Sequence, residues 1–174
     1  MKKIMLIGSG GTGKSTLARQ IGQMLAIEVI HLDTLMWRSN WEIIYKDEQI
    51  AIQQKLVRKD EWIIDGNYGG TMDIRLREAD TVIFFDYSRY LCLYRALKRM
   101  IQYRNKSRPD MVEGNNERLD YAFLKWIWAY PKTKRPVILQ TLTKLSEEKN
   151  VVILGTPKEA KDYIKKLDMQ LTEN

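Results

Sequence analysis

The chain has 174 residues, of which 44% are hydrophobic, and it carries a formal net charge of +7 and one cysteine. This length and apolar content predict a single globular domain with a substantial core. The apolar runs are too short to cross a bilayer, so we expect no membrane segment and a cytoplasmic protein. The lone Cys92 excludes an internal disulfide bond and a cysteine-based zinc site.

A glycine-rich stretch near the start of the chain carries the strongest signal. Residues 4–7 predict a buried strand, and apolar residues recur at helical spacing from Leu17 to Leu25. The stretch between them matches G-x-x-x-x-G-K-[ST], in the strand–loop–helix context that this phosphate-binding pattern requires. We expect Lys14 to reach the β- and γ-phosphates of ATP and the Ser15 hydroxyl to bind Mg²⁺. The predicted nucleotide-binding residues are Gly8, Gly10, Gly11, Thr12, Gly13, Lys14, Ser15 and Thr16.

Strand-like and helix-like segments alternate along the rest of the chain. This alternation predicts an α/β fold of the P-loop NTPase type, with a five-stranded parallel sheet between two helical layers. Pro131 is expected to end the helix that precedes it. The further strands are predicted at 28–33, 61–66, 81–86 and 151–154, and the further helices at 47–59, 72–78, 90–104, 117–130, 137–147 and after Pro157.

Three aspartates follow predicted strands at the edge of the sheet where such folds bind ligands. Asp65 and Asp86 each fit the acid that helps to hold Mg²⁺ in P-loop enzymes. Asp33 is the candidate to orient an acceptor hydroxyl or a metal-bound water. An aspartate in such a place can also cap a helix or form a turn. The two interpretations are balanced for Asp86, and the functional one is favoured for Asp33 and Asp65.

Basic residues are concentrated in one segment. From Arg89 to Arg135 there are twelve Lys or Arg and four Asp or Glu, so the segment is strongly cationic. It can attract nucleic acid or nucleotide phosphates, or it can be a solvated surface. Arg95 and Arg99 share one helix face, and Arg108 and Arg118 flank a loop that contains proline and glycine. Such a loop is what a lid over a transferring phosphate requires.

The motifs together resemble the adenylate kinase branch of P-loop kinases. The matching segments are "EWIIDG", "FFDYSRYLCLYRALKR", "RPDMVEGNNERL" and "LGTPKEA". The resemblance implies the strand order 2-3-1-4-5, an acceptor-site helical segment at 34–60 and a short helical lid at about 100–120. It also implies that Asp65 serves magnesium, that Arg95 and Arg99 contact adenine and phosphate, that Arg108 and Arg118 belong to the lid, and that Gly155 and Thr156 lie near the base.

A second resemblance is to bacterial proteins named DNA topology modulation proteins. It is carried by "HLDTLMW", "WIIDGNYGGTMDIRL" and "RLDYAFLKWIWAYPKTKRP". These proteins are similar to adenylate kinases in sequence, and their name implies a link to DNA supercoiling.

The acceptor side departs from the adenylate kinase pattern. Adenylate kinases carry an arginine shortly after the Asp-Gly pair, and here Gly69 takes its place. Arg75 and Arg77, further along, are the candidates to replace it. Trp37, Trp41 and Tyr68 can stack on a flat ring or belong to the core, and we favour the core for Trp41. His31 is expected to be structural.

We therefore expect an ATP- and Mg²⁺-dependent kinase that phosphorylates an unidentified small molecule, with a nucleoside- or nucleotide-like acceptor left open. The predicted catalytic residues are Lys14, Asp33, Arg99, Arg108 and Arg118. The main alternative is a nucleotide-dependent DNA-binding regulator, and a third is a nucleotide sensor that hydrolyses ATP slowly. The sequence leaves open the acceptor, the oligomeric state and the choice between ATP and GTP.

Overall fold

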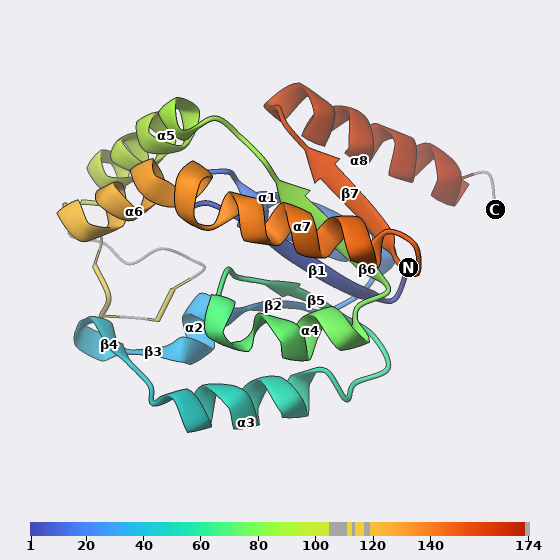
Figure 1. Cartoon of the computed structure of the whole chain (residues 1–174), viewed down its shortest axis with the longest axis horizontal. Helices are drawn as coiled ribbons and strands as arrows, with labels where there is room; N and C mark the ends of the chain where they lie inside the picture. Colours follow the sequence, from blue (N-terminus) through green and yellow to red (C-terminus); the bar gives the residue numbers. More distant parts are fainter. Residues whose placement is uncertain (105–110, 113, 117–118, 173–174) are drawn as a thin grey trace.

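A five-stranded parallel sheet forms the centre of the protein (Figure 1). The computed structural model describes residues 1–104, 111–112, 114–116 and 119–172. The sheet has the order β2-β5-β1-β6-β7, which reads 2-3-1-4-5 when its own strands are numbered along the chain. Its strands are β1 (Lys3–Gly8), β2 (Val29–His31), β5 (Trp62–Asp65), β6 (Thr81–Phe85) and β7 (Asn150–Leu154).

Helices cover both faces of this sheet, which explains why β1 is apolar without alternation. Ile4 and Leu6 pack into one core cluster, with α1 (Lys14–Leu25) and α8 (Pro157–Thr172). Met5 and Ile7 point to the opposite cluster. That second cluster is covered by α2 (Leu32–Met36), α3 (Lys46–Leu56), α4 (Met72–Glu78) and α7 (Arg135–Leu145).

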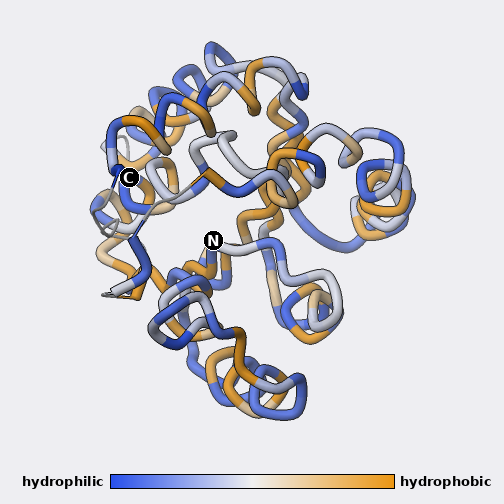
Figure 2. Tube along the Cα trace, turned by 90° about the vertical axis from the view of Figure 1, so that its left-hand side faces the viewer, coloured by the Kyte–Doolittle hydropathy of each residue, from blue (hydrophilic) through white to orange (hydrophobic). Residues whose placement is uncertain are grey.

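Two further helices, α5 (Arg89–Gln102) and α6 (Tyr121–Thr133), pack against each other. Cys92, Ala96 and Ile127 join them to the cluster that holds α1. Figure 2 shows hydrophobic and hydrophilic residues mixed along the helical coils, as expected for helices that each bury one side. Within the described part of the chain, no helix has the length and apolar content needed to span a membrane.

The segment between β2 and β5, which includes the predicted acceptor-site helical segment at 34–60, contains two helices and a hairpin. Strand β2 ends at His31, and α2 begins at the next residue. A small hairpin then follows, made of β3 (Trp37–Arg38) and β4 (Glu42–Ile43) around a 3₁₀ turn at Ser39–Trp41. Helix α3 comes only after this hairpin. The short apolar groups around Trp37 and Ile43 were too brief to show strand periodicity.

Pro131 does not end its helix, so that prediction is wrong. Helix α6 continues through Pro131 to Thr133, and α7 begins at Arg135. A proline removes one N–H donor, and near the end of a helix few later hydrogen bonds depend on that position. The N–H of Lys134 still donates to the carbonyl of Tyr130 at 2.9 Å.

The predicted lid at about 100–120 begins within α5 and lies partly outside the described residues. Between Tyr103 and Asp120, none of the described residues is helical. The division of the chain into a core, an acceptor segment and a lid therefore stays a prediction.

Candidate active site

The glycine-rich loop joins the end of β1 to the start of α1. Gly8, Gly11 and Gly13 have φ angles of 143°, 78° and 92°, which residues with a Cβ adopt only with strain. A Cβ at Gly11 would also overlap the carbonyl of Cys92, and one at Gly10 would overlap the ring of Phe123. Helices α5 and α6 thus pack directly on the loop, which only glycine permits at these positions.

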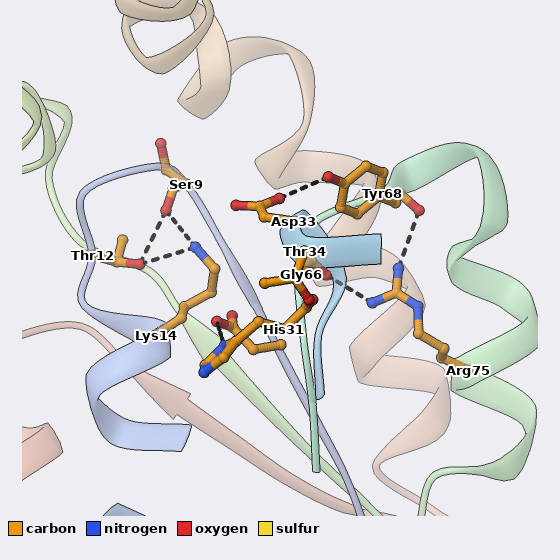
Figure 3. A network of polar contacts seen from close by, with 10 residues as sticks. Ser9, Thr12, Lys14, His31, Asp33, Thr34, Gly66, Tyr68 and Arg75 are labelled. Carbon is orange, nitrogen blue, oxygen red and sulfur yellow. Dashed lines mark hydrogen bonds and ion pairs between the residues drawn. The ribbon is translucent and has the colours of Figure 1, made fainter. Parts of the chain in front are cut away.

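Lys14, the first residue of α1, folds back over the loop (Figure 3). Its Nζ donates to the carbonyl oxygen of Ser9 at 2.8 Å and lies 3.4 Å from the Thr12 hydroxyl. Burial lowers the pKa of Lys14, while the nearby carboxylates of Asp65 and Asp33 oppose that shift. The ammonium is therefore a partly desolvated cation at the point where the motif predicts phosphate.

The two aspartates for which a functional role is predicted lie near this lysine: Asp65 is the last residue of β5, and Asp33 is in the first turn of α2, directly after the neighbouring strand β2. Asp65 is 5% exposed, and its Oδ2 lies 3.1 Å from Nδ1 of His31. Its Oδ1 is buried without a hydrogen-bond partner among the described residues. Asp33 accepts a hydrogen bond of 2.7 Å from the hydroxyl of Tyr68 (Figure 3). The paired register of β2, β5 and β1 brings these groups together.

Arg75 does not replace the missing acceptor arginine, and neither does Arg77. Arg75 is fully buried on α4, and its guanidinium donates to the carbonyls of Gly66 and Tyr68 at 2.7 and 3.1 Å. Burial lowers the pKa of Arg75 to about 10. Arg77 is exposed. Arg75 instead holds the loop that carries Tyr68, and neither arginine is among the described residues that line the cavity.

One cavity of about 1070 Å³ joins the glycine-rich loop to these carboxylates. Gly155 and Thr156 are not among its lining residues, although Pro157, Ala160 and Lys161 are. The N–H of Gly155 and the Thr156 hydroxyl donate to Glu159 in the first turn of α8, and the Glu159 N–H donates to the Thr156 hydroxyl in return. Arg108 and Arg118 lie outside the described residues. The predicted site residues that do line the cavity are Gly8, Gly10, Gly11, Thr12, Gly13, Lys14, Ser15, Thr16, Asp33, Asp65, Arg95 and Arg99.

Several arginines of the basic segment have partners inside the protein. On α5, Arg95 donates to the carbonyl of Thr12 at 3.2 Å, and the guanidinium of Arg99 lies 5.6 Å from the ring centre of Phe123. Arg135 binds both carboxylate oxygens of Asp86, at 2.6 and 2.7 Å. Asp86 therefore anchors α7 by an ion pair, a structural role other than the predicted helix cap or turn, and it is not among the described residues that line the cavity.

Sequence reasoning underestimated two cavity residues. Trp41 is half-buried and lines the cavity, so its assignment to the core is wrong. His31 also lines the cavity, in contact with Asp65. A single histidine at a strand end carries no spacing signal, and only the parallel pairing of β2 with β5 places it there.

No protein-family model matches the chain. Among curated proteins, it is 26% identical over 145 residues to a shikimate kinase of Clostridium botulinum strain 657, an alignment that spans 76% of this chain and 84% of the relative. The shikimate kinase of the Loch Maree strain is 25% identical over the same coverage.

Solved structures show the same fold. A shikimate kinase from Acinetobacter baumannii in complex with shikimate aligns with a TM-score of 0.63 at 17% identity, covering 100% of this chain and 95% of that one. A sugar kinase from Janibacter sp. HTCC2649 aligns with a TM-score of 0.57 at 13% identity, covering 99% and 97%.

These relatives support a P-loop kinase with an unidentified acceptor. They are named as shikimate and sugar kinases. They therefore do not support the predicted resemblance to the adenylate kinase branch or to DNA topology modulation proteins. They give no support to a DNA-binding role.

Proposed function

We propose that the protein transfers the γ-phosphate of ATP to a hydroxyl group of a small molecule. The observation that carries this proposal is the single cavity that contains both the glycine-rich loop and two strand-end carboxylates. A triphosphate on the loop would place its last phosphate near Lys14, and the same space continues to Asp33. Donor and acceptor can therefore meet without leaving the site, which in-line transfer requires.

The residues around Lys14 also fit a magnesium ion. Asp65 presents a buried carboxylate oxygen without a partner among the described residues, and Ser15 lines the same cavity. The described residues contain no group of three or more His, Cys, Asp or Glu side chains placed to hold a metal. The pair of Asp65 and Ser15 suits Mg²⁺, which binds through one or two protein ligands together with substrate phosphates and water. When bound, the ion would neutralise charge on the phosphates.

In the proposed reaction, Asp33 orients the acceptor hydroxyl and takes its proton as the oxygen attacks the γ-phosphorus. The bond from that phosphorus to the bridging oxygen breaks, and ADP leaves. The Tyr68 hydroxyl, 2.7 Å from Asp33, holds that carboxylate in place. Lys14 and Arg99 would stabilise the charge of the transferring group, because both are cations that line the same cavity.

The other predicted site residues would contact the nucleotide or form the lid. Arg95 lies against the loop, with its guanidinium 5.8 Å from the ring centre of Tyr87, which supports a position beside the nucleotide. Gly155 and Thr156 would lie near the base, at the start of α8. Arg108 and Arg118 would close over the phosphates, although both lie outside the described residues.

The proposal is tested by calorimetry and by ATP consumption. Magnesium and ATP should bind the purified protein with measurable heat and raise its melting temperature. An unfractionated small-molecule extract should accelerate ADP formation, and it should not do so with the Lys14→Met variant. Tight ATP binding without any transfer to the extract would contradict a kinase and favour a nucleotide sensor.

A further inference from the structure

We propose that the acceptor carries no negative charge and presents a flat, apolar face to the aromatic part of the cavity. This inference rests on the proposed kinase function and names the class of its substrate. Two independent features carry it: the distribution of charge around the cavity, and a set of aromatic rings held in place at one end of it.

The cationic side chains that line the cavity come from the nucleotide side. They lie on α1, on α5 and on α8. Arg95 contacts that loop directly, and Arg99 lies over Phe123, which packs on Gly10. The described cationic residues of the lining are Lys14, Arg19, Arg95, Arg99 and Lys161.

The acceptor side, built from the segments after β2 and β5, lines the cavity with carboxylates instead. Asp33 faces the space, Asp65 belongs to the proposed magnesium site beside Lys14, and no described Lys or Arg from residues 29–78 lines the cavity. The two arginines nearest to this side of the cavity bind other groups of the protein. Arg38 is exposed and pairs with Glu48 at 3.1 Å, and buried Arg75 binds backbone carbonyls. Among the described residues, an acceptor with its own carboxylate or phosphate would therefore meet the like charge of Asp33 and no cation from these segments, which disfavours binding.

Three aromatic side chains line the same end of the cavity. The rings of Trp37 and Trp41 meet edge to face, with centres 5.8 Å apart and planes at 73°. Tyr68 lines the cavity beside Asp33, to which its hydroxyl donates. Such rings bind a flat or apolar face of a ligand, and they also attract cations.

The turn that carries Trp41 is strained and is held by a buried side chain. Asn40 and Trp41 have φ angles of 64° and 61°. Asparagine tolerates this left-handed region, but it is costly for a bulky residue such as Trp41. Asn115, 1% exposed, accepts from the Trp41 N–H at 2.8 Å and donates to the carbonyl of Arg38 at 2.9 Å. The Trp41 indole N–H donates to the carbonyl of Asn116 at 3.2 Å. Strain that is maintained by such contacts points to a positioned ligand-binding ring.

The charge inference is tested by separating a bacterial small-molecule extract on an anion exchanger at pH 8. The flow-through holds neutral and cationic compounds, and the eluate holds anions. Each fraction is incubated with the protein, Mg²⁺ and γ-labelled ATP, and the Lys14→Met variant provides the blank. We expect at least tenfold more label transferred in the flow-through.

Transfer mainly in the anionic eluate would overturn the inference while supporting the kinase. Transfer in neither fraction, with ATP binding intact, would remove the kinase proposal and this inference with it. A defined pair sharpens the charge test: shikimate and its methyl ester carry the same hydroxyls, and we expect the uncharged ester to be the better acceptor.

The ring inference is tested with the acceptor pool found in the active fraction. We expect Trp37→Leu and Trp41→Leu each to raise the apparent KM for that pool at least fivefold while leaving the KM for ATP unchanged. Trp128→Leu is the matched control, because Trp128 lies on α6 against Arg89 and is not part of the cavity lining. Equal KM values for the acceptor in all three variants would rule out the aromatic subsite.

Discussion

The two halves of the cavity are built in different ways. The nucleotide half is one continuous stretch of chain, in which a strand, a glycine-rich loop and a helix follow one another within residues 3–25. The acceptor half is assembled from β2, the hairpin after it, the loop after β5 and the 114–116 segment, as the contacts of Asp33, Tyr68 and Asn115 show. A local site tolerates change elsewhere in the fold, whereas an assembled site depends on each contact that joins its parts.

The largest effect is expected on the nucleotide half. Lys14→Met should reduce kcat/KM roughly 10³-fold, because it removes the cation that meets the phosphates. It should also abolish the thermal shift with Mg²⁺ and ATP. Lys158→Met, an exposed lysine on α8, is the control and should change neither measurement. A Lys14→Met protein that retained the thermal shift would mean that the loop does not bind the triphosphate through this residue.

The same variant has a predicted effect on stability. Burial lowers the pKa of Lys14, so the unfolded chain holds this proton more tightly than the folded one. Between the lowered pKa and 10.5, the free energy of unfolding should rise with pH, and at neutral pH the buried charge is destabilising. The ligand-free Lys14→Met protein should therefore melt no lower than the parent, which keeps loss of binding distinct from loss of fold.

A substitution at Asp33 tests whether the acceptor half acts separately from the nucleotide half. Asp33→Asn should lower kcat about 10²-fold, because the amide cannot take the proton of the acceptor. The affinity for Mg²⁺ and ATP, measured by calorimetry, should be unchanged. Asp47→Asn, in the exposed first turn of α3, is the control. Loss of ATP affinity in Asp33→Asn would place this carboxylate on the nucleotide side and remove the distinction between the halves.

The assembled character of the acceptor half is tested through Arg75. Arg75→Met should lower the free energy of unfolding by about 3 kcal/mol, because two buried carbonyls lose a charged donor. Urea denaturation measures this change. Arg77→Met, an exposed arginine on the same helix, should stay within about 0.5 kcal/mol of the parent. Equal stabilities of the two variants would show that the loop does not need this anchor.

The smallest effect is expected at Tyr68. Tyr68→Phe removes the hydrogen bond to Asp33 and keeps the ring, so kcat should fall about tenfold while the KM for ATP stays constant. The melting temperature should change little, because the hydroxyl is the only group lost. Steady-state kinetics with the acceptor pool gives the result. An unchanged kcat would mean that Asp33 is held by other contacts.

The nucleotide half could be predicted from the sequence better than the acceptor half, because it is one contiguous stretch and the acceptor half is assembled from distant segments. The glycine-rich loop, Lys14 and Ser15 are a contiguous pattern in which each residue type has a physical reason, and the structure places all of them around one cavity. Asp33 and Asp65 were found because parallel strands end at one edge. Trp41 and Arg75 were misjudged, since their roles depend on contacts with Asn115 and with the loop after β5.

The sequence by itself determined the alternation of apolar strands and amphipathic helices, and with it the parallel sheet and the phosphate-binding loop. These depend on local periodicity and on glycine conformations, which short stretches of sequence encode. Only the tertiary structure decided which charges face the cavity, that Asp86 anchors α7, and that Trp37 and Trp41 line the cavity. Those outcomes depend on contacts between residues far apart in the sequence, such as Trp41 and Asn115. Such contacts produce no recognisable pattern in a short stretch of sequence.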